Sequence, residues 1–177
     1  EAISEAPVKG GFFWRFDFAR TEEIVPASIC VEQGQISYMD RVELKTVHLL
    51  KRMKGVNVSA ITATAHYTIP MRLDQSPYGD NNVRMALKLA VDREALVKQI
   101  LRGYGEPGND HPIAPVNKYH AKELEQRKYD PEKAKFYIKK AGMEDHTFNL
   151  HTAEAAFQGA DDAAILYQEH AKKADIK

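Results

Sequence analysis

Hydrophobic residues recur at helical spacing, every three to four positions, in several stretches after residue 80. Aspartates stand where such stretches begin, at Asp80, Asp92 and Asp130, and an aspartate side chain is a favourable cap for the first backbone N–H groups of a helix. Asp92 opens a second helical segment inside the first stretch, and Pro131 takes the first helical position after Asp130. The pattern predicts helices at about residues 81–103, 131–141 and 161–173.

Alternation of apolar and polar residues indicates strands that accompany these helices. It predicts strands near residues 56–61, 66–73 and 147–152, and the helical pattern predicts a further helix over 44–53 that ends at Gly55. Upstream, we expect a helix to end at Gly34, before a short strand within residues 31–40. Strands that alternate with helices are typical of an α/β protein. Another strand is expected to begin at residues 175–177, so we expect the unit to continue beyond them.

The composition is that of an ordinary globular protein and argues against several kinds of protein. Hydrophobic residues make up 44% and charged residues 28% of the 177 positions. The 25 Lys and Arg residues balance the 25 Asp and Glu residues, whereas proteins that bind nucleic acid normally carry a basic excess. No apolar run approaches the length of a membrane span, and no signal peptide is visible. The single cysteine, Cys30, excludes an internal disulfide and a cysteine-based metal cluster.

Candidate catalytic and metal-binding residues do not combine into a known constellation. His111 and His120 lie in a proline-rich loop, while His146 and His151 flank a predicted strand, and none of them has the four-residue spacing of zinc hydrolases. No serine stands in a Gly-x-Ser-x-Gly sequence. The paired carboxylates of residues 161–162 suit a helix start, where they cap the helix and complement its dipole. We therefore expect no catalysis, no cofactor and no metal site.

One segment carries a motif with a family resemblance. Residues 76–93 read Ser-Pro-Tyr-Gly-Asp-Asn-Asn-Val-Arg-Met-Ala-Leu-Lys-Leu-Ala-Val-Asp-Arg. This stretch resembles the signature of bacterial solute-binding protein family 5, the peptide- and nickel-type binding proteins of ABC importers. Other segments that resemble the family occur in the family's order: Gly34–Ile36, Asp40–Val42, Gly103–Gly105, Gly108–Ile113, Tyr129–Lys135 and Ala141–Gly142. Together the resemblance covers residues 31 to 177, as an internal fragment of the family.

The resemblance implies a two-lobed α/β protein of the type II periplasmic-binding-protein-like fold, which closes around its ligand at a hinge of crossing strands. Residues 1–69 would be part of the first lobe, with residues 1–30 unassigned, and residues 70–177 would begin a second, truncated lobe. The family implies a periplasmic or otherwise extracytoplasmic protein that binds a solute, by default a peptide, and delivers it to ABC transporter permease subunits. Membrane contact would come only through the transporter or a lipid anchor.

The alternative function is a non-catalytic interaction module that docks to a transporter or receptor without a ligand pocket of its own. The aromatic-rich stretch of residues 10–16 suits either a strand or such a docking segment. By resemblance, the acidic residue that pairs with the amino group of a peptide lies beyond this chain. We therefore expect the isolated chain to lack the solute affinity of the whole protein. Self-association is a further expectation, through exposed sheet edges or the aromatic residues Phe12, Phe13, Trp14 and Phe16.

Candidate ligand-contact residues fall into two groups. The loop of residues 151–159 follows a predicted strand and precedes a predicted helix, where open α/β sheets place their ligands, and the resemblance implies that it faces the cleft. The other interpretation is that this loop only connects two elements. The first group offers a hydroxyl, a carboxylate, an aromatic ring and an amide, from Thr152, Glu154, Phe157 and Gln158. The second group, at the inferred crossing, comprises Tyr67, Met71 and Arg72. Arg72 would pair with a ligand carboxylate or with a structural aspartate.

Overall fold

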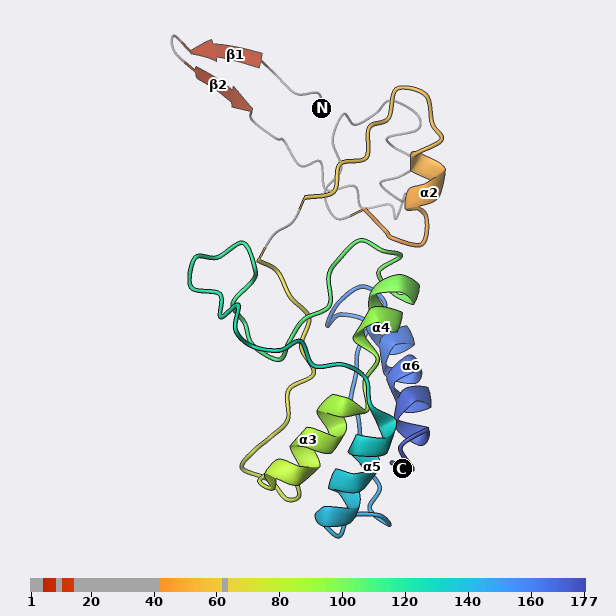
Figure 1. The fold of residues 1–177 in the computed structure, drawn as a ribbon. Coiled ribbons are helices and arrows are strands. Elements are labelled where there is room, and N and C mark those ends of the chain that lie inside the picture. The colour runs from red at the N-terminus through yellow and green to blue at the C-terminus, as the bar shows by residue number, and fades with distance from the viewer. Residues whose placement is uncertain (1–4, 9–10, 15–41, 62–63) are drawn as a thin grey trace. The chain divides into compact units, whose positions relative to one another are not determined.

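The computed structural model describes residues 5–8, 11–14, 42–61 and 64–177. The chain divides into two compact units, residues 1–59 and residues 60–177. Within the described residues, the first unit contains a two-stranded hairpin and a short helix, and the second contains helices joined by loops and extended segments (Figure 1). Among the helices of these residues, none is both long enough and apolar enough to cross a bilayer.

In the first unit, the strands β1 (Glu5–Val8) and β2 (Gly11–Trp14) form an antiparallel hairpin, in which Glu5 lies opposite Trp14. A strand is therefore confirmed for the central part of the aromatic-rich stretch. The expected helix end at Gly34 and the short strand of residues 31–40 fall outside the described residues.

The helix α2 (Val47–Leu50) of the first unit is shorter than the predicted helix of residues 44–53. The residues on both sides of it form i→i+3 turns, which are the tighter geometry found at frayed helix ends. Thr46 stands at the N-cap position but its side chain makes no capping hydrogen bond, so the first turn lacks the usual stabilisation. The backbone reverses at Gly55, whose φ of 84° is the left-handed conformation that glycine adopts without strain.

The second unit contains the helices α3 (Asn81–Leu89), α4 (Arg93–Gln99), α5 (Pro131–Lys140) and α6 (Ala160–Lys172). The carboxylates of Asp80, Asp92 and Asp130 each accept a hydrogen bond from a backbone N–H in the first turn, at distances of 2.8–2.9 Å. The predicted helices are therefore confirmed, but the range 81–103 is divided at residues 90–92 and its second part ends at Gln99. The N-cap of α6 is Gly159, and the paired carboxylates of residues 161–162 lie in the first turn instead, where they complement the helix dipole.

The core of the second unit lies where α3 packs against α5 (Figure 1). Val83 and Ala86 of α3 and Ala134 of α5 are each 0% exposed, and small side chains at this contact let the two helix backbones approach closely. The last residues of the chain join the same core, because Ala174 is 0% exposed and Ile176 is 6% exposed. Complete burial of a side chain such as Val83 stabilises the fold by roughly 1.5–3 kcal/mol.

Carbonyl groups at the end of α3 receive hydrogen bonds from other elements, because the last four carbonyls of a helix have no partner inside it. The hydroxyl of Tyr167 in α6 donates to the carbonyl oxygen of Leu87 at 2.7 Å. The N–H of Asp130, just before α5, donates to the carbonyl oxygen of Leu89 at 3.0 Å. These bonds connect the end of α3 to both neighbouring helices. Burial raises the pKa of Tyr167, so its hydroxyl remains a donor.

The strands predicted at 56–61, 66–73 and 147–152 are not formed in the described residues, where these segments have almost no regular secondary structure. Alternating polarity indicates a backbone that can be extended, but a strand also needs a neighbour with which to exchange ladder hydrogen bonds. The N–H of Phe148 donates to the carbonyl oxygen of Lys177 at 2.8 Å, which places the segment 147–152 beside residue 177. This bond does not continue into a ladder of strand hydrogen bonds. The α/β layering expected from the sequence is therefore not seen in this part of the chain.

Candidate functional site

The loop of residues 151–159 leads into α6 and is held close to the end of α4. Gly159 has a φ of 84°, and a Cβ atom at this position would lie 2.9 Å from the Cγ2 atom of Ile100. A residue larger than glycine would be strained here in its backbone and would press against that side chain. Inside the loop, Thr152, Glu154 and Gln158 are exposed and Phe157 is half-buried. Three polar candidates therefore reach solvent around one anchored aromatic ring.

The rings of Phe157 and Tyr67 stack on each other, with their centroids 4.3 Å apart and their planes inclined by 17°. The contact joins the two groups of candidates that the sequence analysis treats separately, the loop before α6 and the inferred crossing. Tyr67 remains 55% exposed, so this aromatic pair lies at the surface of the second unit. Stacking of this kind stabilises a pair by roughly 0.5–1.5 kcal/mol beyond simple burial. The pair thus forms an accessible, pre-positioned aromatic surface.

The remaining two candidates near the crossing have partners within the chain. The guanidinium of Arg72 donates to both carboxylate oxygens of Asp74, from Nη2 at 2.6 Å and from Nε at 3.2 Å. Hydrogen bonding from Arg72 lowers the pKa of Asp74 from its usual value, although both side chains are well exposed. Of the two alternatives for Arg72, the structure contains the pair with an aspartate. Met71 is half-buried and packs against the core of α3 and α5, which accounts for its apolar side chain.

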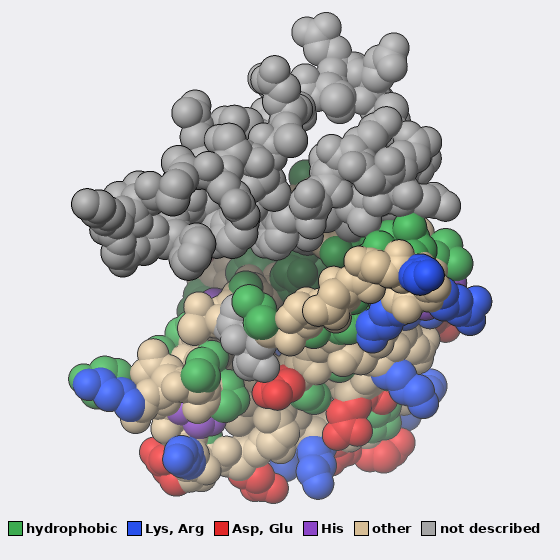
Figure 2. Space-filling view, turned by 90° about the horizontal axis from the view of Figure 1, so that it is seen from above, with side chains coloured by type: hydrophobic (Ala, Val, Ile, Leu, Met, Phe, Trp, Pro, Cys, Tyr) green, Lys and Arg blue, Asp and Glu red, His purple; other side chains and the backbone are tan. Residues whose placement is uncertain are grey.

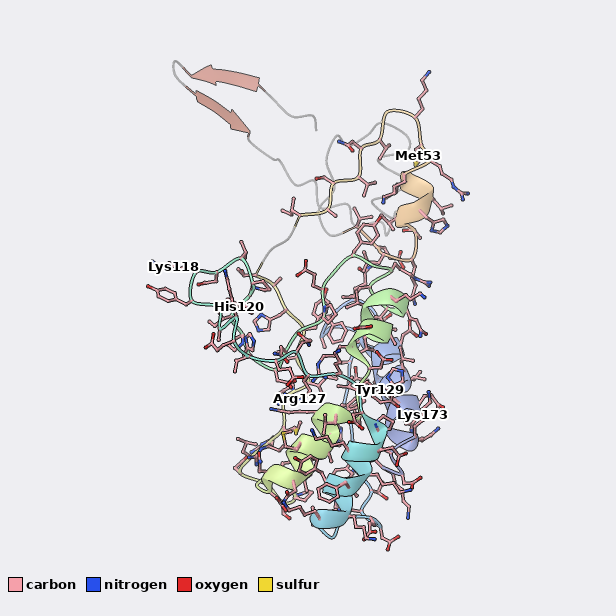
Figure 3. The ribbon with its side chains drawn as sticks, viewed as in Figure 1. Met53, Lys118, His120, Arg127, Tyr129 and Lys173 are labelled. Carbon is pink, nitrogen blue, oxygen red and sulfur yellow. The ribbon has the colours of Figure 1, made fainter. Side chains whose placement is uncertain are left out.

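A second feature, which has no counterpart among the sequence candidates, is an ionic cluster around Asp110. Arg93 of α4 donates to one carboxylate oxygen of Asp110 at 2.7 Å, and Arg127 forms an ion pair with the other. Arg127 lies where the loop of residues 105–128 leads into α5 (Figure 3). The side-chain amide of Asn109 donates from Nδ2 to the carbonyl oxygen of Glu125 and accepts at Oδ1 from the N–H of Arg127. The Asn-Asp dipeptide therefore closes a long loop onto α4.

The residue identities carry a signal for this cluster. Asp110 adopts a φ of 59°, and asparagine and aspartate are the residues that most readily take the left-handed conformation besides glycine. An Asn-Asp pair beside glycine and proline therefore indicates a turn with a side chain free to bind. The partners could not be read from the sequence, because Arg93 and Arg127 each lie 17 positions away.

Several histidines of the second unit lie beside another ring. The rings of His111 and His120 have their centroids 5.2 Å apart, and the ring of His146 lies edge-on to Phe148 at 4.7 Å. His151 is exposed at the start of the candidate loop. The residues that the structure describes contain no group of three or more His, Cys, Asp or Glu side chains with the arrangement of a metal site.

Charged side chains of both signs occur on the face of the molecule that Figure 2 shows. Lys and Arg side chains lie among Asp and Glu side chains on the face shown in Figure 2, and neither sign covers it. This distribution agrees with the formal net charge of zero. No extended patch of one sign that would attract a polyanion or a polycation is seen on this face.

The chain matches the family model of the bacterial extracellular solute-binding proteins, family 5 (middle), over residues 25–177. Glutathione-binding protein GsiB of Escherichia coli O6:K15:H31 (strain 536 / UPEC) is 30% identical over 112 residues, which are 63% of this chain and 22% of that protein. GsiB of Salmonella choleraesuis (strain SC-B67) is 29% identical over 115 residues, which are 65% of this chain and 22% of that protein. The chain thus spans 22% of the length of these relatives.

A solved structure, that of NikZ from Campylobacter jejuni in complex with Ni(L-His), is similar to this chain with a TM-score of 0.63 and 24% sequence identity. The similarity covers 85% of this chain and 32% of that chain. At this level of identity the likeness concerns the fold, which in NikZ is periplasmic-binding-protein-like. Because the family model matches most of its length, this chain belongs to the bacterial extracellular solute-binding proteins, family 5.

Proposed function

We propose that the chain is part of a non-catalytic protein that captures a small solute in the periplasm, or elsewhere outside the cytoplasm, and delivers it to ABC transporter permease subunits. The observation that carries this proposal is the family match over residues 25–177. In this proposal residues 1–69 belong to a first lobe and residues 70–177 begin a second lobe. The solute would lie between the two lobes of the whole protein.

The stacked pair of Tyr67 and Phe157 supports a specific position for one wall of that site. Each ring comes from a different candidate segment, and the stacking orients both before any ligand binds. A pre-positioned aromatic surface loses little side-chain entropy on binding, which favours affinity. Around it, the exposed side chains of Thr152, Glu154 and Gln158 offer a hydroxyl, a carboxylate and an amide. Apolar contact with a few polar groups is the usual composition of a small-molecule site.

The chemistry of these side chains suits a small peptide or a related amino-acid derivative. The carboxylate of Glu154 would pair with an amino group, the amide of Gln158 would bind a peptide group, and the aromatic pair would pack on the apolar parts of the solute. Among the relatives, GsiB is named as a glutathione-binding protein and NikZ was solved with Ni(L-His). Glutathione and the nickel–histidine chelate are both small molecules built from amino acids. Peptides, glutathione and metal–histidine chelates therefore form the first set of probes.

The test begins with native mass spectrometry of the full-length protein purified from its host, which identifies any solute that co-purifies. Calorimetric titration of that solute, or of glutathione, trialanine and the nickel–histidine chelate, then compares the protein with its Phe157→Ala and Tyr67→Ala variants. We expect each variant to bind several-fold more weakly with nearly unchanged thermal stability. Tyr119→Ala removes another exposed tyrosine, 75% exposed on the loop of residues 105–128, and is expected to leave affinity unchanged.

Other outcomes would contradict the proposed solute site or the proposed function. Unchanged affinity in both variants would place the solute away from the aromatic pair. A loss of stability as large as that of a core deletion, roughly 3–5 kcal/mol for a phenylalanine, would assign Phe157 to packing. Absence of any bound or titrated solute in the folded protein would favour the interaction module. Reproducible cleavage of peptide probes would show an enzyme.

A further inference from the structure

The loop of residues 105–128 brings two histidines together that the sequence places apart. The ring centroids of His111 and His120 are 5.2 Å apart and their planes are inclined by 49°. Both residues are half-buried. We propose that His111 and His120 form a site that binds a divalent transition-metal ion through two imidazole nitrogens.

The separation of the two rings agrees with joint coordination of one ion. An imidazole nitrogen binds such an ion at about 2.0–2.1 Å, which puts the ring centroid roughly 3.2 Å from the metal. Two rings that bind one metal at angles between square and tetrahedral then have centroids about 4.5–5.2 Å apart. The observed 5.2 Å lies at the tetrahedral end of this interval. The separation of the two rings is therefore compatible with coordination of one shared ion.

Hydrogen bonding prepares one of the two ligands. The Nδ1 atom of His120 lies 2.8 Å from the carbonyl oxygen of Ile113. A carbonyl oxygen only accepts, so Nδ1 carries the proton and donates it, and the neutral ring keeps its lone pair on Nε2. Metal-binding histidines commonly donate their second ring nitrogen to a backbone carbonyl in this way, which fixes the tautomer and orients the ring. His120 thus has the hydrogen-bonding pattern of a ligand that binds through Nε2.

The backbone that carries both histidines is held in place by the loop itself. His111 directly follows Asp110, which is anchored by Arg93 and Arg127. The N–H of His120 donates to the carbonyl oxygen of Asn117 at 3.0 Å. His120 lies on the loop between α4 and α5 (Figure 3). Since the two positions are fixed before a metal arrives, binding would not have to order the loop.

The donor set indicates which ions would bind. Two neutral imidazoles suit Cu²⁺, Ni²⁺ and Zn²⁺, whereas Mg²⁺ and Ca²⁺ prefer oxygen ligands. The described residues supply no third His, Cys, Asp or Glu to this pair, so water or a small chelating molecule would complete the coordination. An open site of this kind binds an ion reversibly. The proposed metal site does not depend on the proposed solute site, because His111 and His120 are not among the residues assigned to the solute.

The test uses the untagged full-length protein with Cu²⁺, Ni²⁺ and Zn²⁺ chlorides as probes. Calorimetry measures affinity and stoichiometry, and electron paramagnetic resonance of the copper form counts the nitrogen ligands. The variants are His111→Asn, His120→Asn and, as the matched control, His151→Asn, which removes an exposed histidine from the same unit. Circular dichroism before titration verifies that each variant is folded.

We expect one site per chain with two imidazole nitrogens in the copper spectrum. Each of the first two substitutions should weaken metal binding by at least about tenfold and should remove one nitrogen from the spectrum. Loss of a residue that only supports a metal ligand already weakens binding by about tenfold or more. The control should leave affinity and spectrum unchanged. Equal affinity and an unchanged spectrum in folded His111→Asn and His120→Asn variants would overturn the proposal, as would an equal loss in the control. Neither result would affect the solute assignment, which is also measured with glutathione and trialanine, two probes that contain no metal.

Discussion

Replacement of Asp110 by asparagine should destabilise the second unit, because it removes the charge that holds the loop of residues 105–128 to α4. The carboxylate lies between Arg93 and Arg127, and the exposed fractions of the three side chains are 21%, 13% and 27%. Asparagine has nearly the same shape and also tolerates the φ of 59° at this position, so the substitution changes the charge and little else. It retains one carbonyl oxygen as an acceptor but leaves two partly buried guanidinium groups without a counter-charge.

The expected cost follows from the degree of burial. A hydrogen bond to a charged group contributes roughly 1.5–3 kcal/mol, whereas a fully exposed ion pair contributes about 0–1 kcal/mol. The cluster around Asp110 is between these limits, and two bonds are weakened, so we expect a loss of about 2 kcal/mol in the free energy of unfolding. For a protein of this size that corresponds to a fall of roughly 4–8 °C in Tm. High salt should reduce the difference only in part, because salt screens exposed charges more strongly than partly buried ones.

The assay is urea denaturation followed by far-ultraviolet circular dichroism, which reports on the helices of the second unit. Asp145→Asn is the matched control, since Asp145 pairs with Lys177 at 3.0 Å but its side chain is 98% exposed. We expect less than about 0.5 kcal/mol from the control, as for surface substitutions generally. A similarly small effect of Asp110→Asn would refute the reasoning. The loop would then be held by the hydrogen bonds of Asn109 and by packing.

Two further predictions concern groups buried at helix ends. Burial lowers the pKa of His170 below its usual 6.5, and its Nδ1 accepts from the N–H of Asp92, so the neutral ring is the stabilising form. Stability should be complete above pH 6.5 and decline as the pH falls through the lowered pKa of the folded state, and His170→Gln should flatten this profile in urea titrations at several pH values. Tyr167→Phe removes the donor to the carbonyl oxygen of Leu87 and should cost about 1–2 kcal/mol, measured by urea denaturation. Tyr119→Phe, at an exposed tyrosine, should change nothing, and equal effects of the two would assign the loss to something other than that bond.

The helices of this chain could be read from the sequence because their determinants are local. The caps of Asp80, Asp92 and Asp130 each act on a backbone N–H two or three positions later. Such a bond forms wherever the chain bends into a helix, whatever surrounds it. Family membership was readable for a related reason, since an ordered series of short motifs is a property of the chain and not of its packing. The prediction of strands was wrong because alternating polarity is a property of one segment, whereas a sheet requires at least two segments that exchange hydrogen bonds.

The sequence by itself thus determined the helices of the second unit, the aspartate caps of three of them, the family and a set of candidate residues. Only the tertiary structure decided which of these candidates meet. Tyr67 and Phe157 were proposed for separate reasons and are 90 positions apart, yet their rings stack at 4.3 Å. It also paired Arg72 with Asp74, and it brought His111 and His120 together although neither stood among the expected ligands. The physical reason is that contacts between distant positions depend on how loops close and helices pack, and no local pattern of residues encodes that geometry.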